Sequence, residues 1–247
     1  MNELWFTRIF NDAFGSWGVA LRHALHLPAA NPPIPAHVAM EILVAVVLAI
    51  LGTVVGVGLS PDSPRFWQHL FEWLWTGLGQ HAEEIIGHGS RRFLEFLFTL
   101  AIFIFLCNLL GLLPGFMAPT ASVTVPLGLA VIVFIYYHFH GVRHHGVPAY
   151  LKTFAGGLTG MGCLSIPLVL MMVPVEIISH FARMLSLTAR LYANMLAGDM
   201  VIVTMTALFP LAGCLFMALH VFEALLQAYI FVLLAIIYLA GATAEEH

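Results

Sequence analysis

Uninterrupted apolar runs are the feature of this sequence that most restricts its fold. The longest runs cover residues 166–208 and 211–242, and shorter ones cover residues 39–59, 93–113 and 123–139. About 20 apolar residues are enough to cross the hydrocarbon core of a bilayer as a helix. Because the runs are continuous rather than alternating, we expect spanning helices and not barrel strands. The longest run exceeds one perpendicular span, so its helix must tilt, curve or break.

Composition points to the same class of protein. Of the 247 residues, 61% are hydrophobic and only 9% are charged, whereas soluble globular proteins carry about 25% charged residues. The sequence therefore predicts an all-α membrane protein with about five membrane-embedded helices. It offers no basic patch for nucleic acid, and Cys107, Cys163 and Cys214 lack the spacing of a metal site. We expect neither a metal nor a cofactor.

The remaining segments divide the chain into an arm and a single membrane domain. Residues 1–36 carry charges and end in a proline-rich breaker, which is typical of an extramembrane N-terminal arm. Residues 37–247 form the predicted membrane domain. Within it, residues 66–89 mix aromatic and acidic side chains, and this mixture indicates an amphipathic helix at the membrane interface. We expect a polar loop over residues 140–153 and a long tilted helical hairpin over residues 166–243.

Basic residues predict the orientation of the chain. They gather in the loops after the first and third spans, and the loop between the second and third spans carries no charge. These basic residues are Arg65, Arg91, Arg92, Arg143 and Lys152. By the positive-inside rule, the basic loops are cytoplasmic. The N-terminal arm is then outside, and the C-terminus is in the cytoplasm.

Arg190 is the most informative single residue, because long apolar stretches flank it on both sides. A charged side chain at the centre of a bilayer costs about 2.5–3.5 kcal/mol on insertion scales, so an intramembrane charge indicates a functional site. Arginine is not deprotonated in proteins, so a pKa shift cannot remove this charge. The sequence therefore predicts a function that needs a permanent positive charge inside the membrane.

Polar residues of the last two helices fall at matching heights if these helices form an antiparallel hairpin. The level partners are Asp199 with His220, Arg190 with residues 227–229, and Asn194 with residues 224–226. In addition, His220, Glu223 and Gln227 stand at i, i+3 and i+7, so they share one helix face. Composition alone does not force rare polar residues to meet in this way.

Two groups of titratable side chains follow from this geometry, one on either side of Arg190. They are Asp199, His220 and Glu223 toward the outer side, and Glu176, His180 and Arg183 toward the cytoplasmic side. Carboxylates and imidazoles in a low-dielectric environment change protonation near neutral pH, so both groups suit proton transfer. Arg190 cannot relay protons, but it can block a proton path and attract a carboxylate. Glu176 and Arg183 also fit a second interpretation, as side chains that reach the membrane edge.

Three segments resemble subunit a of the F-type ATP synthase membrane sector. Residues 187–199 (LTARLYANMLAGD) are similar to its signature helix, residues 227–239 to its last helix, and residues 119–122 to its outer turn before the third span. The resemblance extends from about residue 90 to the C-terminus. It implies a stator subunit in a bacterial inner (plasma) membrane, surrounded by lipid and packed against a ring of c-subunits, with peripheral-stalk b subunits as further partners.

The resemblance also implies roles for individual residues. Protons would enter by one aqueous half-channel, ride on the ring carboxylates and leave by the other, with Arg190 as the essential arginine facing the ring. The outer half-channel positions are Asn194, Asp199, His220 and Gln227, and Glu176 matches an inner one. Ser122 stands where some members have an acid, and Glu223 adds an acid one turn from His220. The chemistry of ATP would lie elsewhere, because the chain has no Walker-type glycine-rich loop.

The main alternative is a stand-alone secondary transporter or ion channel that uses the same polar residues. Such a protein would show an internal repeat and a pair of helices broken by glycine or proline near mid-membrane, and the sequence shows neither. An intramembrane enzyme would need a metal motif or a nucleophile pair. A purely structural anchor would not explain Arg190 opposite Gln227. Sodium coupling stays open, although His220 favours protons.

Overall fold

The structure is a computed structural model that describes residues 5–26, 28, 31–58, 66–87, 89–113, 115–153 and 165–243. Arg65 and Cys163 lie outside the described residues. The helices are α1 (Trp5–Ala24), α2 (Ala36–Gly58), α3 (Phe66–Ile86), α4 (Arg91–Leu110), α5 (Thr124–His145), α6 (Val147–Thr153), α7 (Ser165–Leu208) and α8 (Pro210–Thr243), with a 3-10 turn η1 (Pro119–Ala121) before α5.

Five of these helices are long and apolar enough to cross a membrane. They are α2, α4, α5, α7 and α8. Since no strand occurs within the described residues, the prediction of an all-α membrane protein with about five embedded helices is confirmed. The expected polar loop over residues 140–153 is wrong, because α5 continues to His145 and α6 follows directly. Of the basic residues in this segment, Arg143 stands in the last turn of α5, where a cation suits the negative end of the helix dipole, and Lys152 stands in α6.

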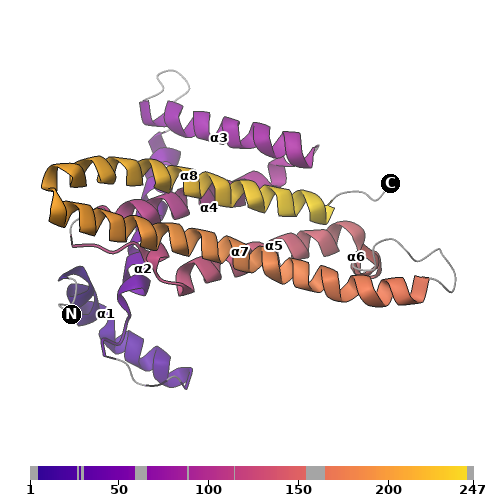
Figure 1. Cartoon of the computed structure of the whole chain (residues 1–247), viewed down its shortest axis with the longest axis horizontal. Helices are drawn as coiled ribbons and strands as arrows, with labels where there is room; N and C mark the ends of the chain where they lie inside the picture. The colour runs from indigo at the N-terminus through magenta and orange to yellow at the C-terminus, as the bar shows by residue number, and fades with distance from the viewer. Residues whose placement is uncertain are drawn as a thin grey trace.

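The hairpin of α7 and α8 dominates the architecture. Helix α7 has 44 residues and continues through Pro174 without ending. At 1.5 Å per residue it extends ~66 Å, about twice the thickness of a hydrocarbon core. Figure 1 shows α7 and α8 side by side, both running across the direction of α2. The long apolar run was expected to tilt, curve or break. It forms one continuous helix that is strongly tilted relative to α2.

The core lies where α8 packs against α4, α5 and α7. Its fully buried side chains include Leu97, Ile104, Leu191, Met195, Phe231 and Ile236. Helix α8 is central, since 44% of its most apolar window is buried, whereas only 11% of the α7 window is buried. Most of the α7 surface is therefore available to lipid or to a partner.

Three helices lie outside the five spans: the short α6, which follows α5, and α1 and α3, which lie near opposite ends of α2. Helix α1 lies by the start of α2, and α3 follows its end and runs along α8 (Figure 1). The packing of α3 against α4 and α8 occupies one of its sides and leaves Trp73 72% exposed on another. An interfacial position for α3 stays a prediction from its amphipathic sequence.

Candidate functional site

The first polar cluster surrounds His220 on α8 and is named here the His220 cluster (Asp199, His220 and Glu223). His220 is 2% exposed, and its Nε2 lies 3.7 Å from Asp199 Oδ1 on α7. Its Nδ1 lies 3.5 Å from Glu223 Oε2, one turn further along α8. The predicted contact between Asp199 and His220 across the hairpin is thus present.

The His220 imidazole is placed to pass a proton between two carboxylates. Both distances to the carboxylate oxygens exceed the usual range of an N–H···O hydrogen bond. Neither ring nitrogen has a hydrogen-bond partner among the described residues. A bridging water molecule or a small side-chain movement would be needed to complete a bond on either side. Imidazole can both accept and release a proton near neutral pH.

Gly198 makes the close approach of His220 to α7 feasible. A Cβ atom at Gly198 would overlap the His220 imidazole and would lie 3.1 Å from Glu223 Oε2. Gly198 was not among the site residues predicted from the sequence. A signal was available, because glycine in a helix interior costs about 1 kcal/mol relative to alanine and therefore often has a packing reason.

Asn194 and Gln227 join the two helices of the hairpin between the polar clusters. Asn194 Nδ2 donates to Gln227 Oε1 at 2.9 Å, and Gln227 is only 1% exposed. The sequence predicted Asn194 level with residues 224–226, slightly before Gln227. Helical side chains lean toward the N-terminus of their own helix, so the amide group of Gln227 lies nearer the level of residues 224–226, where the partner of Asn194 was predicted. The other Gln227 amide atom, Nε2, is buried without a partner in the described part of the chain.

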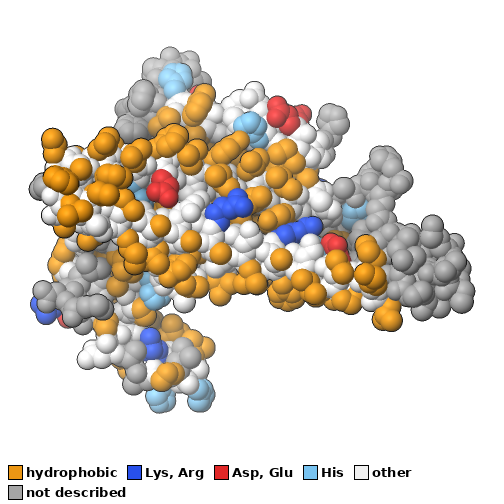
Figure 2. All heavy atoms as spheres, in the orientation of Figure 1, with side chains coloured by type: hydrophobic (Ala, Val, Ile, Leu, Met, Phe, Trp, Pro, Cys, Tyr) orange, Lys and Arg blue, Asp and Glu red, His pale blue; other side chains and the backbone are white. Residues whose placement is uncertain are grey.

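Arg190 lies on the exposed side of α7 rather than in the hairpin seam. Within the described residues its guanidinium makes no hydrogen bond or ion pair, and it does not bond to Gln227. The neighbouring exposed residues on this side are small: Ser186, Ala189, Ala193 and Ala197. Figure 2 shows basic side chains (blue) between acidic ones (red) along the hairpin, on a face that is otherwise mostly apolar. A permanent charge therefore faces outward from an apolar surface.

The second polar cluster is centred on His180 and is named the His180 cluster (Glu176, His180 and Arg183). His180 Nε2 lies 3.3 Å from Glu176 Oε1, and its Nδ1 lies 2.8 Å from the Tyr137 hydroxyl on α5. The Arg183 guanidinium stands 5.6 Å from the ring centre of Tyr238 on α8, a cation–π distance. The three residues predicted for this side of Arg190 therefore gather in one place, with two tyrosines.

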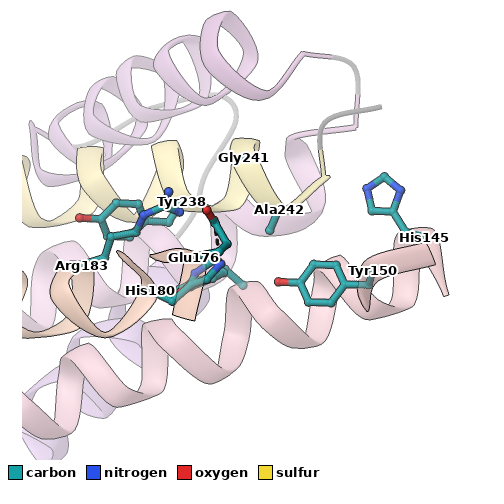
Figure 3. Close-up of a pocket in the computed structure, with 9 residues that line it drawn as sticks. His145, Tyr150, Glu176, His180, Arg183, Tyr238, Gly241 and Ala242 are labelled. Carbon is teal, nitrogen blue, oxygen red and sulfur yellow. Dashed lines mark hydrogen bonds and ion pairs between the residues drawn. The ribbon is translucent and has the colours of Figure 1, made fainter. Parts of the chain in front are cut away.

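A polar pocket of about 120 Å³ opens at the His180 cluster. Figure 3 shows Glu176, His180 and Arg183 at this pocket, with the Tyr150 hydroxyl of α6 pointing toward them. A water molecule occupies about 30 Å³ in the liquid, so a cavity of this size and polarity has room for several. Burial raises the pKa of the Tyr150 phenol, which keeps it protonated and able to donate a hydrogen bond at neutral pH.

The sequence analysis missed the tyrosines of this pocket. Tyr238 could have been found, because it stands eleven residues, or about three turns, after Gln227 on the same side of α8. Tyr137 and Tyr150 gave no comparable signal, since they come from α5 and from the segment expected to be a loop. His145, which belongs to the segment expected to be a polar loop, borders the pocket as well.

Ser122, the remaining predicted site residue, is placed elsewhere. Its Oγ lies 3.1 Å from Thr124 Oγ1 at the start of α5, and the described residues show no hydrogen bond or ion pair between it and either cluster. Close to it in sequence, the buried Thr120 hydroxyl donates to Asn108 Oδ1 at 2.7 Å. Within the described ranges, no three His, Cys, Asp or Glu side chains are placed to hold a metal ion.

The fold and these clusters define a class: a multi-pass α-helical membrane protein with titratable groups along a tilted hairpin. Comparison with known proteins narrows this class. A family model described as ATP synthase A chain matches residues 38–240. The chain is 44% identical over 249 residues to ATP synthase subunit a of Koribacter versatilis, covering 100% of this chain and 99% of the relative.

Two further relatives carry the same description. ATP synthase subunit a of Solibacter usitatus is 44% identical over 242 residues, which is 97% of this chain and 100% of the relative. That of Desulfosudis oleivorans is 40% identical over 220 residues, covering 86% and 91%. The chain therefore belongs to the ATP synthase subunit a family. It is an integral, multi-pass subunit of the F-type ATP synthase membrane sector and works in a complex with other ATP synthase subunits.

Proposed function

We propose that the chain is the non-catalytic, proton-conducting stator subunit of its complex. Two aqueous half-channels lead to the carboxylates of a ring of c-subunits, one through the His220 cluster and one through the His180 cluster. Arg190 separates the two paths. The observation that carries this proposal is the position of Arg190, which is exposed on α7 between the two clusters and has no anionic partner among the described residues.

The surroundings of Arg190 favour a partner that brings a carboxylate. A guanidinium that faces an apolar environment is costly when alone, and its strongest hydrogen bonds are to carboxylates. Small residues beside it (Ser186, Ala189, Ala193 and Ala197) let a partner helix approach closely, as small residues do between membrane helices. A ring carboxylate that loses its proton would be held by Arg190 until the ring moves on.

The two clusters provide acid–base groups on either side of that step. On the outer side, a proton moves among Asp199, His220 and Glu223, and the polar pair Asn194–Gln227 continues toward Arg190. On the cytoplasmic side, Glu176 and His180 receive protons at the polar pocket. Arg190 carries a charge that repels protons and cannot relay them, so it prevents a direct path from one cluster to the other.

The wider setting is part of the same proposal. The partners are the c-ring and peripheral-stalk b subunits, and the transported ion is the proton. The basic residues at the ends of α4 and α5 (Arg91, Arg92 and Arg143) support a cytoplasmic C-terminus in a bacterial inner membrane. Each elementary charge moved across 100 mV releases about 2.3 kcal/mol, so several protons are needed for each ATP. That requirement suits a rotor with many carboxylates and a stationary subunit that only delivers protons to it.

The test is ATP-driven acidification of inverted membrane vesicles that carry Arg190→Ala. A pull-down of the complex verifies that the ring and the peripheral subunits still assemble. Arg143→Ala is the matched control, because Arg143 is an exposed arginine at the end of α5, outside both clusters. We expect assembly in both variants and loss of pumping only in Arg190→Ala. Pumping near the wild-type rate in that variant would make the arginine structural and refute the proposal.

A further inference from the structure

Helix α1 separates its apolar and polar side chains cleanly. At 100° per residue, one continuous arc of the helix contains Phe6, Ile9, Phe10, Phe14, Trp17 and Leu21. This set is named here the apolar arc. Three of its rings stack in sequence, with centroids 6.0 Å apart for Phe6–Phe10 and 5.0 Å apart for Phe10–Phe14. The other arcs carry the charged and small residues together with Trp5 and Val19.

The helix turns its polar side toward the protein and most of its apolar arc away from it, although Phe6 also contacts Phe116, with ring centroids 5.7 Å apart. Asn11 Nδ2 donates to the Ile34 carbonyl at 3.1 Å, and the Ile34 N–H donates to Asn11 Oδ1 at 3.0 Å. Arg22 Nε donates to the Pro33 carbonyl at 2.8 Å. Trp17 is consequently 78% exposed and Leu21 62% exposed. A helix on the surface of a soluble protein has the opposite arrangement, with its apolar side against the core.

Packing contacts hold α1 at the level where membrane spans end. The Trp5 ring packs edge-on against Phe116, with centroids 5.5 Å apart. Phe116 belongs to the turn after α4, and Gly115 beside it has φ +90° and leaves no room for a Cβ next to the Trp5 ring. At its other end, α1 is bonded to the segment just before α2. Figure 1 shows α1 beside the start of α2.

We propose that α1 is a lipid-binding helix that lies on the membrane surface, with its apolar arc in the boundary between headgroups and acyl chains. Three features select lipid as the occupant. The arc lies at the level of the span ends, tryptophan is enriched at that boundary, and α2, whose start lies beside α1, has an exposed apolar side (Ile42, Val46 and Ile50) that suits the hydrocarbon. This inference is independent of the proton path, and it places the predicted extramembrane arm on the bilayer.

A third arc of α1 is suited to water. Arg8, Asp12 and His23 are exposed on the side away from the apolar arc, and Ser16 is exposed at its border beside Ile9; these four residues are named the wet arc. An amphipathic helix with a polar arc and an apolar arc that carries Trp, Phe and Leu is typical of an interfacial anchor. Side chains next to each other in sequence, such as Asp12 and Ala13 or Ser16 and Trp17, should therefore meet different environments.

The experiment measures the environment of single spin labels on α1 in the assembled complex. The complex is reconstituted in vesicles of phosphatidylethanolamine and phosphatidylglycerol, in a background with the three native cysteines replaced by alanine. On the apolar side, labelled cysteines replace Trp17, Leu21 and Ala13, which lies between Ile9 and Phe6 around the helix. On the wet arc they replace Asp12, Ser16 and His23. All six positions are exposed, and ATP-driven pumping shows that each variant assembles. Collision rates are measured with oxygen, which concentrates in lipid, and with a water-soluble nickel chelate.

The proposal expects a ratio of oxygen to nickel collisions several-fold higher on the apolar arc than on the wet arc. Low collision rates with both reagents on the apolar arc would show a protein partner there and would overturn the proposal. Equal, high nickel collision rates at all six positions would show a helix in water and would overturn it as well. The neighbouring pairs Asp12/Ala13 and Ser16/Trp17 serve as internal controls for local mobility.

Discussion

Replacing Gly198 with alanine should disable the His220 cluster. The new Cβ would overlap the His220 imidazole, and ordinary contacts between such atoms begin at 3.4 Å. The ring must therefore retreat by roughly 1 Å, a displacement that can slow a geometry-dependent transfer about 100-fold. His220 is 2% exposed, so it has little free space. Overpacking of this kind lowers the free energy of unfolding by about 1–3 kcal/mol.

Two assays follow these two effects of Gly198→Ala. Passive proton flux is measured in vesicles stripped of the ATP-hydrolysing sector, under an imposed membrane potential, and thermal unfolding is measured on the detergent-solubilised complex. Gly128→Ala is the matched control, because a Cβ at this helical glycine meets no atom within 4 Å. We expect a large loss of flux and a lower unfolding temperature for Gly198→Ala, with both unchanged for Gly128→Ala.

A double-mutant cycle isolates the contact that causes the loss of stability. In a His220→Ala background the overlapping ring is absent, so Gly198→Ala should then change the unfolding temperature very little. The flux stays low in both backgrounds, since His220 is itself the proposed proton carrier. An equal loss of stability with and without the imidazole, or wild-type flux in Gly198→Ala, would refute this reasoning.

Three further substitutions test other parts of the structure. Asn194→Leu leaves the buried Gln227 amide without its partner and should lower the free energy of unfolding by about 1–3 kcal/mol. When Gln227→Leu is added, thermal unfolding should show a partial recovery of stability. No recovery would argue against a stabilising Asn194–Gln227 pair. Tyr137→Phe removes the hydroxyl bonded to His180 and should slow proton flux. Tyr136→Phe is the control and should leave the flux unchanged, because the Tyr136 ring stacks on Phe96 at 3.8 Å. Equal flux in both variants would contradict a role for the Tyr137 hydroxyl. Gly115→Ala forces φ +90° on a residue with a Cβ, which costs about 1–2 kcal/mol, and should make α1 more accessible to protease. Gly56→Ala is the control, because a Cβ at Gly56 meets no neighbour within 4 Å. Unchanged protease resistance in Gly115→Ala would mean that Trp5 does not hold α1 in place.

The hairpin contacts could be predicted because helix geometry is regular. Once two helices are antiparallel and joined by a tight turn, the rise of 1.5 Å per residue fixes which positions are level. For this reason the contact between Asp199 and His220 was available from the sequence. The small displacement at Asn194 comes from the lean of the long Gln227 side chain, which residue numbers alone do not include.

The environment of His180 could not be derived in the same way. Tyr137 and Tyr150 reach it from α5 and α6, and the rotation of those helices is set by packing over the whole bundle. A basic stretch such as residues 140–153 fits both a loop and a helix end, so its helical form was missed. The inverted orientation of α1 was also inaccessible, because it depends on the backbone bonds of Asn11 to Ile34.

The central claim is that the permanent charge of Arg190 separates two proton paths. The most direct measurement is proton leak through vesicles stripped of the ATP-hydrolysing sector and carrying Arg190→Ala, compared with Arg190→Lys, which preserves a cation at this position. The account predicts a leak above the wild-type level in Arg190→Ala, a smaller leak in Arg190→Lys, and no ATP-driven pumping by Arg190→Ala in complete complexes. A wild-type leak together with wild-type pumping in Arg190→Ala would contradict it.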